Sequence, residues 1–131
     1  YKVIIAHPER YREVIEDPNI LYELTGEGIY AQVNSSSLMG VFGERVKRTA
    51  EILFLHNTVQ LIGSDLHSTG RRGQTFLEGV ERLKELDKSK AELMLFNNSR
   101  VIENKEIESL EALPYEEERG FLARVKRYFV S

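Results

Sequence analysis

Residues 59–73, VQLIGSDLHSTGRRG, contain the junction on which the predicted fold depends. The apolar run at 59–63 has the length and composition of a strand that is buried on both faces. It is followed by Asp65 and His67, and then by two arginines in a glycine-flanked loop. A buried strand that ends in reactive polar residues is typical of parallel α/β proteins, which bind ligands at the carboxyl ends of their strands.

Two other runs of strand length precede this one. Residues 2–6, KVIIA, predict a buried parallel strand, and residues 29–34, IYAQVN, predict a second one. Helical patterns follow the strands, at 11–16, 18–28, 44–56, 74–86 and 90–98. The alternation of strands and helices predicts an α/β fold with a parallel sheet or barrel.

The ends of two of these helices have specific signals. Asp17 is expected to cap the second helix, with Pro18 at its first position, and a glycine at 26 or 28 is expected to end it. Ser89 is expected to cap the last of the five helices.

The C-terminal region differs in composition from the rest of the chain. It is acidic and is interrupted by Pro114 and Gly120, and residues 121–130 then place apolar side chains at helical spacing. We therefore divide the chain into an α/β unit at 1–113 and a helical tail at 114–131 that packs on the same domain. A helix for subunit contact or for a membrane surface is the alternative.

The composition excludes several classes of protein. A chain of 131 residues with 41% hydrophobic and 30% charged residues is sufficient for one globular domain. The net charge of −3 argues against nucleic-acid binding. The absence of cysteine excludes disulfides, zinc–thiolate sites and thiol nucleophiles. No apolar run approaches the ~20 residues of a membrane span, and no signal peptide is visible, so we expect a cytoplasmic protein without membrane insertion.

The start of the chain is unusual for a complete domain. The chain begins with Tyr1, not with methionine, and already lies within a strand-like run. We expect that an N-terminal segment has been removed, by design or by proteolysis. A purified domain with a cleaved tag is the alternative.

The pair Asp65 and His67 is the first candidate site. Residues at i and i+2 of an extended segment face the same way. A carboxylate and an imidazole that point together suit Mn²⁺, Fe²⁺ or Zn²⁺, and such an ion lowers the pKa of a bound water toward ~7. For this pair alone, a structural hydrogen bond between the two side chains is the slightly favoured interpretation.

His7 strengthens the interpretation as a metal site, because it follows a second predicted strand directly. With Asp65 and His67 it forms a set of metal-ligand residue types at two strand ends. Pro8 is expected to restrict His7 to extended backbone. Glu9 either pairs with Arg10 or ligates a metal, and the sequence does not separate these alternatives.

Arginines lie in the loops around the predicted metal site. Arg10 and Arg72 are expected to bind phosphate oxygens through planar, bidentate hydrogen bonds, whereas Arg71 fits a solvated loop. His56 lies at a helix end, where an imidazole interacts favourably with the terminal carbonyls, so we assign it a structural role. The other polar residues at the strand ends are Gln32, Asn34, Ser35 and Ser64.

Three segments together resemble a known family. They are IIAHPERY at 4–11, YAQVNSSSLMGVFG at 30–43 and IGSDLHSTGRRG at 62–73. The chain is similar to the bacterial protein-tyrosine phosphatases of capsule and exopolysaccharide loci, which belong to the polymerase and histidinol phosphatase (PHP) superfamily. The resemblance runs over nearly the whole chain, and its middle segment separates these phosphatases from a generic PHP enzyme.

The resemblance implies a fold, a reaction and a set of roles. The fold is a distorted (β/α)₇ PHP barrel with parallel strands and up to three divalent metal ions, often Mn²⁺, with Fe²⁺ or Zn²⁺ as alternatives. A metal-activated water attacks phosphotyrosine in the tyrosine-rich tail of a bacterial tyrosine kinase that controls polysaccharide chain length. In this pattern His7, Asp65 and His67 are metal ligands, with Asp65 also part of the catalytic site, and Arg10 and Arg72 bind the phosphate.

The chain also departs from the family pattern. The family opens with an H-x-H pair and acidic ligands that would precede Tyr1, and the only histidines here are His7, His56 and His67. We therefore expect residues 1–113 to be the C-terminal part of the barrel. We expect the chain alone to be inactive, or active only by assembling with the missing half. The open barrel edges also favour association with another chain or a homo-oligomer.

Two other functions remain as alternatives. One is a different phosphoesterase of the same superfamily, acting on histidinol phosphate or on nucleic acid, although the acidic balance argues against nucleic acid. The other is a truncated module without catalytic activity that binds a partner.

Overall fold

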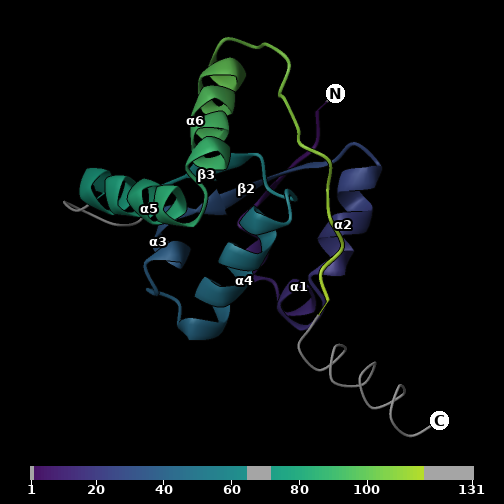
Figure 1. The fold of residues 1–131 in the computed structure, drawn as a ribbon, viewed down its shortest axis with the longest axis vertical. Helices are drawn as coiled ribbons and strands as arrows, with labels where there is room; N and C mark the ends of the chain where they lie inside the picture. Colours follow the sequence, from purple (N-terminus) through teal and green to yellow (C-terminus); the bar gives the residue numbers. More distant parts are fainter. Residues whose placement is uncertain (1, 65–71, 117–131) are drawn as a thin grey trace, which may run out of the picture.

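The computed structural model describes residues 2–64 and 72–116 (Figure 1). Within these residues the chain forms an α/β unit with three parallel strands, which confirms the predicted fold class. The elements are β1 (Ile4–Ala6), the 3₁₀ helix η1 (Pro8–Arg10), α1 (Arg12–Glu16), α2 (Asn19–Gly26), β2 (Tyr30–Asn34), α3 (Ser35–Leu38), α4 (Glu44–Leu55), β3 (Leu61–Gly63), α5 (Arg72–Leu86) and α6 (Lys88–Ile102).

The three strands lie in chain order, β1-β2-β3, and both pairings are parallel. Ala6 is opposite Gln32, and Asn34 is opposite Gly63, so all three strands end at one edge of the sheet. The core lies between β2 and the surrounding helices. Its largest buried side chains are Leu21, Val33, Leu38, Leu53, Phe54 and Leu83.

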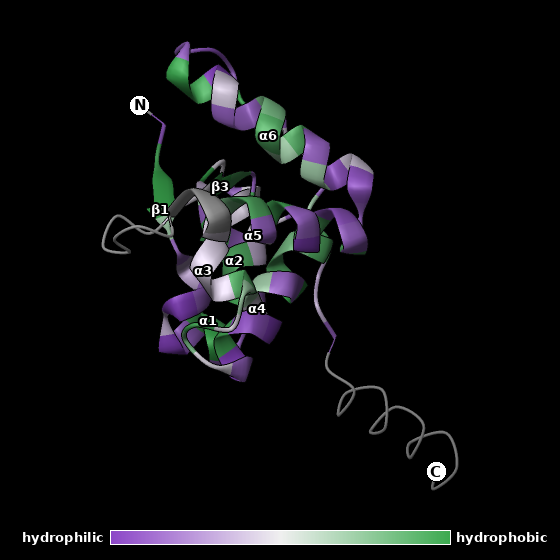
Figure 2. Cartoon of the chain, turned by 90° about the vertical axis from the view of Figure 1, so that its left-hand side faces the viewer, coloured by the Kyte–Doolittle hydropathy of each residue, from purple (hydrophilic) through white to green (hydrophobic). Residues whose placement is uncertain are grey.

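The first strand is more exposed than predicted. The expectation of a strand buried on both faces is wrong for β1, because β1 is an edge strand of the described sheet and has no neighbour on its outer side. Val3 is 54% exposed and Ile4 is 37% exposed. Figure 2 shows β1 as a hydrophobic strand at the border of the molecule. An apolar edge of this kind is open to pairing with another strand.

The opposite edge is closed by a side chain. Asn98, in α6, accepts a 3.1 Å hydrogen bond from the backbone N–H of Ile62 and donates a 2.7 Å hydrogen bond to its carbonyl oxygen. Its amide therefore takes the place of a fourth strand beside β3. The two edges of the described sheet differ in their capacity to accept a partner.

Two predicted helix starts need correction. Asp17 does accept a hydrogen bond from the N–H of Asn19, at 3.1 Å, but α2 begins at Asn19, one residue later than expected. Asp87, not Ser89, caps α6, and its carboxylate accepts the N–H of Lys90 at 3.1 Å. Asp is as effective a cap as Ser, so the choice between neighbouring candidates depends on where the preceding helix ends.

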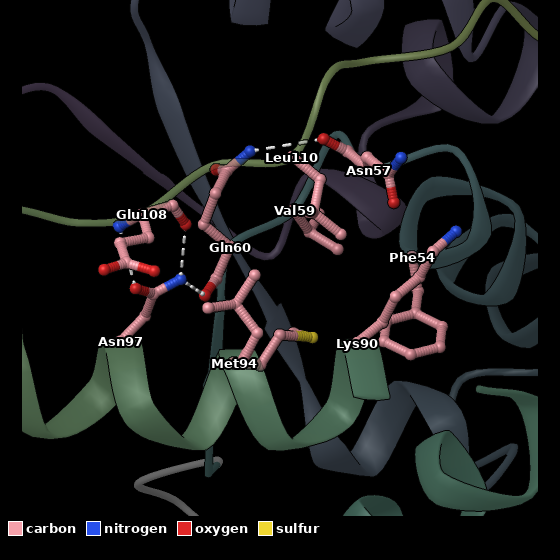
Figure 3. A pocket seen from close by; sticks show the side chains of 10 residues that line it. Phe54, Asn57, Val59, Gln60, Lys90, Met94, Asn97, Glu108 and Leu110 are labelled. Carbon is pink, nitrogen blue, oxygen red and sulfur yellow. Dashed lines mark hydrogen bonds between the residues drawn. The ribbon is translucent and has the colours of Figure 1, made fainter. Parts of the chain in front are cut away.

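Residues 103–116 form neither helix nor strand and pass from α6 to α2 as a strap (Figure 1). Asparagine amides hold it through its backbone. Asn97 donates to and accepts from Glu108, at 2.8 and 2.9 Å (Figure 3), and Asn19 makes the same pair of bonds with Tyr115, at 2.9 and 2.8 Å. Asn57 donates to the carbonyl of Glu111 at 2.9 Å.

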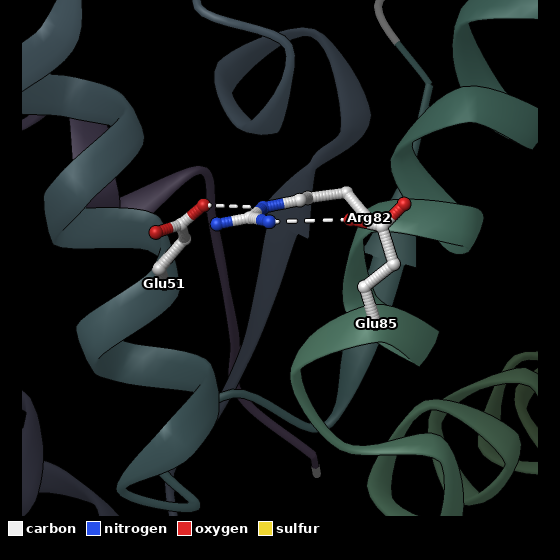
Figure 4. A network of polar contacts seen from close by, with 3 residues as sticks. All are labelled: Glu51, Arg82 and Glu85. Atoms are coloured by element: carbon white, nitrogen blue, oxygen red, sulfur yellow. Dashed lines mark hydrogen bonds and ion pairs between the residues drawn. The ribbon is translucent and has the colours of Figure 1, made fainter.

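Helices α4 and α5 are joined by an ion-pair network (Figure 4). Arg82 lies 2.7 Å from Glu51 of α4 and 3.2 Å from Glu85 of its own helix. The hydrogen bond to Glu51 is the largest cause of a raised pKa at Arg82. This contact links α4 to α5, whose first residue is Arg72 and whose Val80 and Leu83 lie in the core. No helix within the described ranges is long and apolar enough to cross a bilayer.

Candidate functional site

The carboxyl ends of the strands place two of the predicted site residues together. The N–H of His7 donates a 2.8 Å hydrogen bond to the carbonyl of Gln32, which ties the exit of β1 to β2. Arg10 follows three residues later, at the end of η1. Asp65 and His67 lie outside the described residues, as does Arg71. Arg72 is the first residue of α5, and its side chain also lies outside the described part.

The backbone of His7 differs from the prediction. His7 is left-handed, with φ 40° and ψ 58°, so the expectation of extended backbone before Pro8 is wrong. Proline disfavours the right-handed helical region for the residue before it. The left-handed region turns the chain directly from β1 into η1, where the N–H of Arg10 donates to the carbonyl of His7 at 3.1 Å. Strained backbone of this kind costs about 1–3 kcal/mol and gathers at functional sites.

The imidazole of His7 has an unused nitrogen. Its Nδ1 atom is buried and has no hydrogen-bond partner among the described residues. The ring makes an edge contact with Tyr11, with the ring centroids 5.8 Å apart. A neutral imidazole nitrogen without a partner is a suitable ligand for a divalent metal. His7 therefore fits the ligand role that the sequence predicts for it.

Glu9 makes a contact that neither sequence-based alternative predicted. It is fully buried, and its Oε2 accepts a 3.0 Å hydrogen bond from the backbone N–H of Asn34. Burial raises the pKa of this carboxyl, while the neighbouring Ser37 and the Asn34 hydrogen bond partly oppose the rise. Its Oε1 has no partner with hydrogen-bond geometry in the described residues. Glu9 is therefore a brace between the exits of β1 and β2, and no ion pair with Arg10 is found within 2–64 and 72–116.

The polar residues at the end of β2 build the local structure. Asn34 caps α3, and its Oδ1 accepts the N–H of Ser36 at 3.3 Å. The side chain of Gln32 covers Gly63, where a Cβ atom would lie 2.1 Å from the Gln32 amide nitrogen. The hydroxyls of Ser35 and Ser37 are buried without partners in the described part of the chain. This edge thus has a concentration of unsatisfied polar atoms, as expected where a ligand binds.

Arg10 is exposed and carries no ion pair within the described residues. Its guanidinium lies over the ring of Phe42, with Cζ 3.9 Å from the ring centroid. Sequence reasoning did not identify Phe42. The signal available was an aromatic residue between Gly40 and Gly43, in the loop that follows the second strand.

The structural interpretation of His56 is confirmed. It follows the last residue of α4, its Nδ1 lies 2.7 Å from the carbonyl of Ile52, and its ring contacts Tyr115 edge-on. The described residues contain no group of three His, Cys, Asp or Glu side chains that would hold a metal. Among the predicted site residues that the structure describes, His7 and Arg10 both follow β1, one directly after the strand and one at the end of η1.

Comparisons with known proteins identify relatives of this chain. Residues 1–103 match the family described as capsular polysaccharide synthesis, CpsB/CapC. The chain is 34% identical to the tyrosine-protein phosphatase YwqE of Bacillus subtilis over 102 residues, which cover 78% of the chain and 40% of the relative. It is 26% identical to the tyrosine-protein phosphatase CpsB of Streptococcus agalactiae serotype III, covering 76% of the chain and 43% of the relative.

A solved structure gives the same result. The fold of this chain matches that of a protein chain from the crystal structures of YwqE from Bacillus subtilis and CpsB from Streptococcus pneumoniae. These two proteins are described as metal-dependent tyrosine phosphatases. The TM-score is 0.83 and the identity is 30%, over 89% of this chain and 48% of the other. The chain therefore spans less than half the length of these relatives.

Proposed function

The chain belongs to the CpsB/CapC family of capsular polysaccharide synthesis, and from this membership we propose that it supplies one wall of a metal-dependent tyrosine phosphatase site. The observation that carries the proposal is that His7 and Arg10 follow the same strand, with the His7 Nδ1 buried and without a hydrogen bond, and Arg10 without an ion pair, within 2–64 and 72–116. These are the residue types that a phosphate ester and a divalent metal require together.

His7, Asp65 and His67 would hold the metal in this proposal. Divalent ions, with Mn²⁺ as the proposed species, would polarise the phosphate and make hydroxide available near neutral pH. Arg10 and Arg72 would bind the non-bridging phosphate oxygens through in-plane N–H donors and stabilise the charge that develops on them. The opposite wall of the site would come from a segment that corresponds to the part of the relatives which this chain does not match.

The proposed substrates and setting follow from the relatives. Tyrosine phosphatases of capsule synthesis imply a phosphotyrosine protein as substrate, and we propose the tyrosine-rich tail of a bacterial tyrosine kinase. We propose that this protein acts in the cytoplasm. The apolar, open edge of β1 would be the surface through which this chain joins the rest of the barrel or a second copy. The tail at 114–131 is proposed to pack on the same domain.

The test compares the chain with a full-length parent protein that carries residues 1–131. We expect the parent to hydrolyse a phosphotyrosine peptide in a chelator-sensitive reaction, and the 131-residue chain to show no turnover unless the missing portion is co-expressed. Histidinol phosphate serves as the competing substrate. Robust Mn²⁺-dependent turnover by the chain alone would contradict the proposal of an incomplete site.

Variants of the parent test the individual roles. His7→Ala, Asp65→Asn and His67→Ala are each expected to lower both bound metal and turnover, because even the loss of a group that only orients a metal ligand costs about 10–100-fold in affinity or activity. His56→Ala is the matched control, since its imidazole bonds the carbonyl of Ile52 at the end of α4, before β3 begins, and not at a strand exit. An unchanged metal content in His7→Ala would remove His7 from the ligand set.

A further inference from the structure

The contact between Arg10 and Phe42 joins two different strand exits. Arg10 ends η1, which follows β1, whereas Phe42 lies in the loop between α3 and α4, which follows β2. The guanidinium carbon is 3.9 Å from the centre of the aromatic ring, the distance of a close cation–π stack. The position of Arg10 therefore depends on a segment more than thirty residues away in the chain.

The loop that carries Phe42 has a fixed backbone. Gly40 and Gly43 have φ values of 81° and 97°, which favour glycine, and they enclose Val41 and Phe42. The N–H of Val41 donates to Ser36 at 3.2 Å, and the N–H of Gly43 donates to Gly40 at 3.1 Å. This tight turn leads directly into α4 and holds the ring of Phe42, which is 36% exposed.

A separation of 3.9 Å between Cζ and the ring centre is that of a face-to-face stack, which leaves the edge of the guanidinium free. All five N–H donors of arginine lie in the guanidinium plane, so a ring on the face does not compete with an oxyanion at the edge. No hydrogen bond or ion pair uses these donors within the described ranges. The adjacent carboxylate of Glu9 does not neutralise the charge, because it is buried and bound to the backbone of Asn34.

We propose that Phe42 is a positioning residue for phosphate: its ring orients Arg10 so that the free edge of the guanidinium faces a bound phosphoryl group. An exposed arginine loses much rotamer freedom when it binds a ligand, and that loss weakens binding. The stack orders the side chain before the ligand arrives. The inference rests on the proposed function, in which Arg10 is a phosphate ligand.

The test measures the binding of inorganic phosphate by calorimetry to the metal-loaded, full-length parent protein. Phe42→Leu keeps the apolar bulk and removes the aromatic face. We expect phosphate affinity to fall by about two- to five-fold, the equivalent of a stack worth about 0.5–1 kcal/mol. Phe42→Trp keeps a π face and is expected to retain or improve the affinity. Val41→Ala, in the same turn, is the control and is expected to leave it unchanged.

A double-mutant cycle separates positioning from general damage to the loop. In an Arg10→Ala background, Phe42→Leu is expected to cause no further loss of phosphate affinity, because there is no guanidinium left to position. An equal loss in both backgrounds, or full affinity in Phe42→Leu alone, would overturn the inference.

The remaining outcomes distinguish the inference from the proposed function. If the unmodified parent binds no phosphate, Phe42 has no ligand site to serve and the inference fails. If the parent binds phosphate and the cycle shows coupling, but phosphotyrosine is not hydrolysed, the positioning role of Phe42 stands and the proposed phosphatase function fails.

Discussion

Glu9 joins the exits of β1 and β2 by accepting the backbone N–H of Asn34 at 3.0 Å, with its carboxylate fully buried. His7 and Arg10 flank this glutamate on either side in the sequence. The geometry of both candidate site residues therefore depends on this contact between the Glu9 side chain and the Asn34 backbone.

We predict that Glu9→Ala destabilises the chain strongly and Glu9→Gln much less. Alanine leaves the N–H of Asn34 buried without an acceptor, which costs about 1–3 kcal/mol in addition to the cavity. Glutamine keeps an oxygen acceptor of the same reach and removes the burial of a carboxyl. Urea unfolding of the three proteins measures the difference. Equal destabilisation by both substitutions would show that the Asn34 contact does not matter.

We predict that Asn98→Ala makes the chain associate. The substitution frees the N–H and carbonyl of Ile62, which Asn98 now binds at 3.1 and 2.7 Å, and exposes a second sheet edge. Light scattering should show association that increases with concentration, together with a loss of about 1–3 kcal/mol in stability. Ser99→Ala is the control, because Ser99 is exposed and its hydroxyl bonds only its own helix. The idea fails if both variants remain at the same size as the unmodified chain.

We predict that Gly79→Ala is destabilising although alanine favours helices. A Cβ atom at Gly79 in α5 would lie 2.8 Å from the Cβ atom and 3.1 Å from the Cα atom of Ser35, so α5 must move away from α3. Overpacking of this kind costs about 1–3 kcal/mol. Gly26→Ala is the matched control: a Cβ atom there meets nothing within 4 Å, and we expect equal or slightly higher stability. Thermal unfolding of both variants measures these changes in stability. A Gly79→Ala variant that is more stable than the unmodified chain would contradict the close approach of α5 to Ser35.

We predict that chelation lowers the melting temperature of the full-length parent protein as well as its activity, and that Mn²⁺ restores both. A ligand that binds only the folded state stabilises it by mass action. His7→Ala should reduce this chelator-dependent shift, whereas His56→Ala should lower stability without changing the shift. If the chelator-dependent shift in melting temperature is equal in both histidine variants, His7 is not a metal ligand.

The sequence was sufficient for the fold because its apolar runs are short, regular and separated by helical patterns. It was less informative where tertiary contacts decide local geometry. The apolar run of β1 looks buried, but a sequence does not tell which strand lies at an edge. Pro8 restricts His7 without specifying which of the remaining backbone regions the turn into η1 requires.

The same limit applies to the candidate site. His7 and Arg10 were identified from residue type and place after a strand, and the structure brings both to the carboxyl edge. Their ligand roles stay predictions, and Asp65 and His67 lie outside the described residues. The sequence left the role of Glu9 open and indicated none for Phe42. A buried brace and a stacking partner are recognised by the residues that they contact, and these contacts are not visible in the order of the residues.

The strap at 103–116 is held mainly through its backbone. Asn19, Asn57 and Asn97 bind main-chain atoms of residues 103–116, and such atoms are the same whatever side chains the strap carries. Substitutions in the strap should therefore be tolerated, provided that the three asparagine amides and the buried Ile107 remain. The family match stops at residue 103, just after α6 ends, while ordered packing continues to residue 116. Backbone contacts of this kind hold a segment in place without specifying its sequence.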